Sequence, residues 1–148
     1  MTASTDSLSS HPDTAAPADS AGRRRIRRLL TIGIAVVAAL VLWLLPTQVV
    51  GTDLTVDQGM GRQPVLVPLV LAAPILSGFT GWGLLALLER LFGRRGRTAW
   101  RVIAIVVMVL SCTSPLLAAT SVGTAGWLVA MHLVVGLILI IGFAPRRR

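Results

Sequence analysis

The chain has 148 residues, of which 54% are hydrophobic and 14% charged, and its mean hydropathy is +0.78. A chain of this length that is so apolar does not have the composition of an ordinary soluble domain. All fourteen basic residues are arginines, and the net charge is +8; because the arginines adjoin long apolar runs, we expect them to contact the lipid bilayer and its anionic headgroups, and we expect no nucleic-acid partner.

Residues 1–28 are predicted to form a cytoplasmic tail. Residues 1–22 are rich in Ser, Thr, Ala, Pro and Asp, and they carry too little large apolar surface to offset the entropy lost on ordering, so this part is expected to be disordered. A basic juxtamembrane block then precedes the first apolar run and consists of Arg23, Arg24, Arg25, Arg27 and Arg28.

Four apolar runs predict a transmembrane domain at residues 29–145, which is followed by a basic cytoplasmic end at residues 146–148. Each run has at least the roughly 20 residues that are needed to cross about 30 Å of hydrocarbon. The predicted spans are at about residues 29–50, 65–88, 99–119 and 125–144. Short connections favour antiparallel neighbours. The predicted fold class is therefore all-α, a polytopic membrane protein with four transmembrane helices in a small up-down bundle.

The distribution of arginine predicts the orientation of these spans. Thirteen arginines lie before the first span, in the connection between the second and third, or after the fourth, whereas Arg62 alone lies in a loop of the opposite side. Positive charge beside a span is retained in the cytoplasm, so both termini are expected to be cytoplasmic. Arginine in place of lysine, with abundant Ala, Val and Gly, is typical of GC-rich bacterial genomes. We therefore expect a multi-pass protein of the bacterial plasma membrane.

The first run is longer than the apolar region of a secretory signal and is interpreted as an anchor. In the loop after it, Leu54 and Val56 alternate with polar residues and predict one short strand. The second span carries Ala73, Ser77 and Gly81 at four-residue spacing, a stripe of small side chains that predicts a helix-packing face toward another span or another copy of the chain.

Polar residues within the third and fourth spans are the candidates for function, because a polar side chain in hydrocarbon is costly without a partner. Ser111, Ser114 and His132 form a candidate pocket, and Gly136 lies one turn from His132 and predicts close helix packing. Pro115 removes a helical donor and leaves the carbonyl of Ser111 free. In one interpretation His132 is neutral and bonded to another helix; in the other it lies on the wall of an outward-opening pocket, or acts in proton relay or metal ligation.

The second span ends at Glu89, for which an ion pair with Arg97 or Arg101 in the following loop is predicted. One cysteine, Cys112, and one histidine within the spans do not make a paired-thiol or bis-histidine site, so no cofactor and no metal site are predicted. Ser114 and His132 lack a visible third group, and catalysis is not expected. The leading hypothesis is a non-enzymatic structural or accessory membrane protein, as a homo-oligomer or with an unknown membrane partner; the alternative is a small transporter or ligand-binding bundle with a pocket near His132 and Ser114.

Several sequence segments carry a resemblance that covers about residues 25–143. They are the Arg-rich start of the first span, G-T-D-L-T-V, G-W-G-L-L-A-L-L-E-R, S-x-x-S-P-L and M-H-L-V-V-G. With these segments the chain resembles a family of actinobacterial four-span integral membrane proteins classified as a domain of unknown function. The resemblance implies a four-span fold and supplies no activity.

Overall fold

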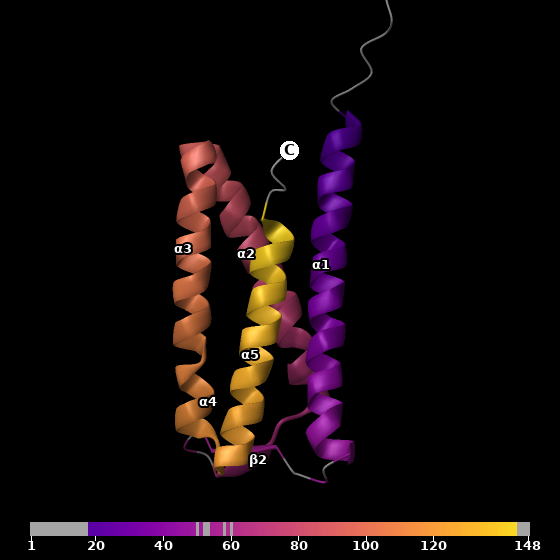
Figure 1. The fold of residues 1–148 in the computed structure, drawn as a ribbon, viewed down its shortest axis with the longest axis vertical. Coiled ribbons are helices and arrows are strands. Elements are labelled where there is room, and N and C mark those ends of the chain that lie inside the picture. Colours follow the sequence, from indigo (N-terminus) through magenta and orange to yellow (C-terminus); the bar gives the residue numbers. More distant parts are fainter. Residues whose placement is uncertain (1–17, 50, 52–53, 58, 60, 145–148) are drawn as a thin grey trace, which may run out of the picture.

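The computed structural model describes residues 18–49, 51, 54–57, 59 and 61–144, and it is almost entirely helical (Figure 1). Its elements are helices α1 (Ala18–Leu44), α2 (Val67–Phe92), α3 (Arg94–Ser111), α4 (Thr113–Ala118) and α5 (Val122–Phe143), a π-helical turn η1 (Leu45–Val49), and strands β1 (Thr55–Asp57) and β2 (Arg62–Pro64). Four helical segments, Gly22–Gln48, Val67–Phe92, Arg94–Ala118 and Val122–Phe143, are long and apolar enough to cross a membrane. The predicted all-α, four-span fold is confirmed.

The long helices run up and down along a common direction, and α4 continues α3 after a break (Figure 1). The start of α1, the connection between α2 and α3 and the end of α5 lie at one end of the bundle, which we call the arginine end. The β1–β2 hairpin lies at the other end, the hairpin end. Helix α2 is inclined, since it leaves α3 at the arginine end and reaches α1 toward the hairpin end.

The first helix begins before the apolar run. Helix α1 starts at Ala18, so residues 18–28, which were expected within the tail, are helical and carry the basic block as a direct extension of the first span. Arginine is a good helix former. Because adding residues to an existing helix avoids the cost of nucleation, this exposed extension of α1 needs no apolar face. The rest of the predicted tail and the basic end at residues 146–148 lie outside the described residues.

The hairpin end contains two short strands where the sequence predicted one. Strands β1 and β2 pair antiparallel, and Thr55 faces Pro64 in the register. An isolated bridge joins Val56 to Ala119, and the hydroxyl oxygens of Thr55 and Thr120 are 2.6 Å apart. The hairpin is therefore attached to the turn before α5, so the connection after α1 and the connection before α5 form one layer.

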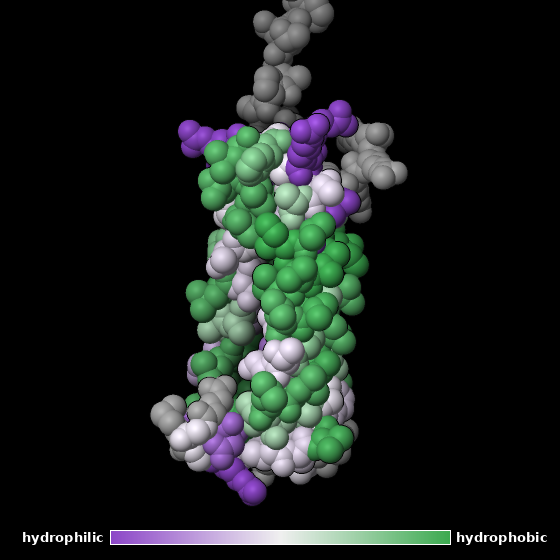
Figure 2. Space-filling view, turned by 90° about the vertical axis from the view of Figure 1, so that its left-hand side faces the viewer, coloured by the Kyte–Doolittle hydropathy of each residue, from purple (hydrophilic) through white to green (hydrophobic). Residues whose placement is uncertain are grey.

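The buried core is thin and consists of two clusters along α1 and α5. The first contains Ile32, Ala35, Leu85, Trp100, Leu139 and Phe143, and the second contains Ala39, Val70, Leu128 and Met131. Many other large apolar side chains are exposed on the outside of the bundle. Figure 2 shows them as a broad hydrophobic band with hydrophilic side chains at both ends. This is the arrangement expected of a bundle whose outer surface contacts hydrocarbon.

Small residues set how closely the helices approach. A Cβ atom at Gly78 of α2 would lie 2.6 Å from Ile32 of α1, and a Cβ atom at Gly136 of α5 would lie 2.7 Å from Met108 of α3. A Cβ atom at Gly142 of α5 would collide with the side chain of Thr31. Each of these glycines is the position where a neighbouring side chain fits against a helix backbone, as in other tightly packed membrane helices.

Candidate functional site

A groove of about 490 Å³ lies between α2, α3 and α5. It arises because α2 leaves α3 at the arginine end and inclines toward α1, which separates the two helices over the rest of their length (Figure 1). Small and polar side chains of α2 form one wall, α3 forms the other, and α5 contributes to the lining between them. Its lining is mostly apolar, and five lining side chains have N–H, O–H or ring-nitrogen groups: Ser77, Thr80, Trp100, Ser111 and His132.

The small-residue stripe of α2 lies on this groove. Ala73, Ser77 and Gly81 all line it. The carbonyl of Gly81 accepts a hydrogen bond of 2.8 Å from the indole N–H of Trp100. Ala73 and Ser77 remain exposed to the groove, whereas the neighbouring Gly78 is buried and packs against Ile32 of α1. The four-residue spacing thus identified a face of α2 with small side chains, but most of that face lines the groove instead of packing against another helix.

His132 lies on the groove and is bonded to its own helix. Its Nδ1 is 2.7 Å from the carbonyl oxygen of Leu128, one turn earlier in α5. The expectation of a partner on another helix is wrong for this bond. A carbonyl oxygen can only accept, so Nδ1 must carry the proton of this hydrogen bond. In a neutral imidazole the other nitrogen, Nε2, is then an acceptor without a proton, and His132 is an exposed residue that lines the groove.

The structure separates the three predicted pocket residues. Ser111 lines the groove together with His132, whereas Ser114 is exposed in α4 and is not among the lining residues. The helix is interrupted at Cys112, where α3 ends and α4 begins. Pro115 is buried in α4, and its missing N–H is consistent with a break one turn before it. This break places Ser111 at the end of α3 and moves Ser114 away from the groove.

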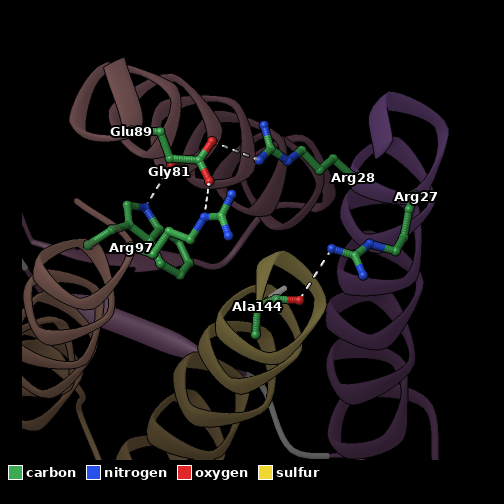
Figure 3. A network of polar contacts seen from close by, with 7 residues as sticks. Arg27, Arg28, Gly81, Glu89, Arg97 and Ala144 are labelled. Carbon is green, nitrogen blue, oxygen red and sulfur yellow. Dashed lines mark hydrogen bonds and ion pairs between the residues drawn. The ribbon is translucent and has the colours of Figure 1, made fainter. Parts of the chain in front are cut away.

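A polar cluster at the arginine end connects three of the four long helical segments (Figure 3). Glu89 of α2 accepts a 2.8 Å hydrogen bond from Nε of Arg97 in α3, as the sequence predicted. The second carboxylate oxygen is 3.6 Å from a guanidinium nitrogen of Arg28 in α1, a partner that local spacing gave no means of finding. The Arg28 guanidinium also lies 5.8 Å from the ring centre of Trp82. We call Glu89, Arg28 and Arg97 the clasp.

The fourth helical segment joins through a neighbouring arginine. Arg27 of α1 donates a 3.2 Å hydrogen bond to the carbonyl oxygen of Ala144, which caps the end of α5 (Figure 3). A cation at a helix C-terminus also interacts favourably with the helix dipole. The Nε atom of Arg27 is buried and has no partner among the described residues. Together, the clasp and Arg27 hold the ends of all four helical segments in one layer.

The described part of the chain contains no group of three or more His, Cys, Asp or Glu residues that could hold a metal ion. Cys112 is a free thiol. The groove offers apolar surface together with hydroxyl, indole and imidazole groups.

The comparisons with known proteins give one match. The sequence model of a family of unknown function (DUF6069) matches residues 19–148. No curated protein matches the chain, and no solved structure matches it.

Proposed function

Since the chain belongs to this family of unknown function (DUF6069), which supplies no activity, we propose from its own features that it is a non-enzymatic multi-pass protein of an actinobacterial plasma membrane. In this proposal it is a structural or accessory component, it has both termini in the cytoplasm, and its arginine end contacts anionic lipid headgroups.

The position of the arginines carries this proposal. The basic block of α1, the connection between α2 and α3 and the clasp all lie at the arginine end, whereas Arg62 lies in β2 at the hairpin end. Positive charge flanking apolar helices favours retention on the cytoplasmic side, and Arg62 alone is too little charge to oppose it. The apolar band between the two ends supports insertion across the bilayer (Figure 2).

Reporter fusions test the orientation directly. Fusions within Gly93–Thr98 and after Arg148 should read cytoplasmic, and a fusion at Gln58 should read external, because an even number of spans returns the chain to its starting side. A matched control replaces Arg94, Arg95 and Arg97 by Gln, which should weaken the bias without changing span length. An external reading at the C-terminus of the parent chain would contradict the four-span orientation.

A second candidate function is a ligand-binding bundle, and the groove at Ser111 and His132 favours it. These two residues share one cavity, and the size of that cavity falls within the range of roughly 300–1,000 Å³ found for small-molecule sites. A few polar groups in a mostly apolar lining are also typical of such sites. Ser114 is not needed for this candidate.

Spin labelling tests whether the groove is an open space in the membrane. A nitroxide at Ser111, in a Cys112→Ser background, should be less mobile than one at exposed Val109 on the same helix, because helix walls flank it. Both labels should collide with oxygen, and neither with a water-soluble nickel chelate, if the groove opens to lipid. Nickel collisions at Ser111 alone would indicate the outward-opening, hydrated pocket expected from the sequence. Loss of all collisions at Ser111 would mean that the groove is closed.

A further inference from the structure

The hydrogen-bonding groups of the groove define which ligand it can satisfy. His132 lines the groove, and its bond to Leu128 places a proton on Nδ1, so in a neutral ring Nε2 is an acceptor without a partner among the described residues. The hydroxyls of Ser77, Thr80 and Ser111 also line the groove and have no hydrogen-bond partner among the described residues. They can donate or accept, whereas Nε2 requires a donor.

The packing of α3 on α5 places the two central polar groups at the same level. Met108 of α3 packs against Gly136 of α5, and the two helices run in opposite directions. About one turn from this contact toward the hairpin end, α3 presents Ser111 and α5 presents His132. One small polar group of a ligand can therefore lie between an acceptor nitrogen and a hydroxyl that can donate to it.

We propose that the groove between α2, α3 and α5 binds a lipid phenol, a molecule with a hydroxyl-bearing aromatic ring and a long apolar chain. The phenol O–H donates to Nε2 of His132, and its oxygen accepts from the Ser111 hydroxyl. The chain lies along the apolar wall of α3, and the ligand enters sideways from the bilayer. This proposal rests on the ligand-binding candidate function above.

Charge and hydrogen bonding together favour this class. No arginine and no carboxylate lines the groove, so an anionic or cationic group there would be desolvated without a counter-charge. A ketone, an ester or an oxidised quinone has no O–H and would leave Nε2 without a donor. A phenol buries the large apolar surface of its ring together with its hydroxyl. The hydroxyl of a simple alkanol has no such ring surface beside it.

Two probes that differ only in one hydrogen-bond donor test the proposal. The full-length protein, in lipid nanodiscs and with ¹⁵N-labelled histidine, is titrated with 4-nonylphenol and with its methyl ether, 4-nonylanisole. We expect the phenol to shift the resonance of the unprotonated ring nitrogen of His132 and to bind about tenfold more tightly than the ether, as for one hydrogen bond in an apolar site. 1-Dodecanol serves as the alkanol arm and should bind more weakly than the phenol.

The variants separate this proposal from the candidate function. His132→Leu keeps an apolar side chain but removes the acceptor, so phenol and ether should then bind equally; Ser111→Ala should reduce the preference by a smaller factor. Equal binding of phenol and ether to the parent protein would overturn the phenol proposal and leave ligand binding intact. No binding of any probe, or a groove occupied by a second copy in cross-linking through position 111, would overturn both. Tighter binding of dodecanol than of the phenol would replace the phenol by an alkanol.

Discussion

Gly96→Ala should unfold or strongly destabilise the α2–α3 hairpin. A Cβ atom at Gly96 would collide with the carbonyl oxygen of Leu88, would lie 2.5 Å from its carbonyl carbon, and would lie 3.0 Å from the backbone nitrogen of Glu89. These are backbone atoms, so no side-chain rotation can relieve the overlap, and α2 and α3 must separate. Because overpacking typically costs about 1–3 kcal/mol even where side chains can move, we expect a loss of at least about 3 kcal/mol.

Gly81→Ala is the matched control for this substitution. Its Cβ atom would lie 3.7 Å from Phe143 and 4.0 Å from Trp100, which are ordinary packing distances. Both substitutions replace a helical glycine by the best helix former, a gain of up to about 1 kcal/mol in solvent-exposed helices. The midpoint of thermal unfolding in detergent should therefore fall sharply for Gly96→Ala and stay equal or rise for Gly81→Ala. Equal midpoints for the two variants would show that α2 and α3 do not approach as closely as described.

The sequence predicted the spans well because apolar length and arginine position are local properties. The four spans and their antiparallel order follow from hydropathy and short connections, and the pair Glu89–Arg97 follows from two groups that flank one tight turn. The close approach at Gly136 was also predicted from a small residue beside a polar one. The start of α1 was predicted too late in the chain. The apolar run begins after the arginines, but the helix already includes them.

The features that sequence did not predict depend on how the helices are inclined. Whether Ala73 and Ser77 contact a helix or line a groove depends on the angle between α2 and α3, which no local pattern encodes. Ser114 and His132 were matched by depth alone, and the break at Cys112 separated them. The partner of His132 was expected on another helix, whereas the structure places it on the i−4 carbonyl of the same helix, at Leu128. Arg28 joins Glu89 only because α1 lies beside α2.

Glu89→Gln should weaken the clasp by leaving a cation without its counter-charge. The Arg28 side chain is only 15% exposed, whereas that of Arg97 is 41% exposed and can reach water. The main cost should therefore arise at Arg28. Breaking a buried pair costs roughly 3–5 kcal/mol and exposed pairs are worth under about 1 kcal/mol, so we expect about 2 kcal/mol for this partly exposed site. Thermal unfolding in detergent measures it, and Arg90→Gln, at an exposed neighbour, is the control with little expected effect.

A second substitution at Arg28 should reverse part of this loss. Removing one partner of a buried pair strands the other charge, whereas replacing both partners by apolar groups is often close to neutral. Arg28→Leu in the Glu89→Gln background should therefore be more stable than Glu89→Gln alone, although it removes a further interaction with Trp82. Arg97→Leu in the same background should give little recovery, because the Arg97 guanidinium can be solvated without Glu89. Recovery by Arg97→Leu but not by Arg28→Leu would show that Arg97, and not Arg28, depends on the carboxylate. That result would contradict the ion pair that joins α1 to α2 in the clasp.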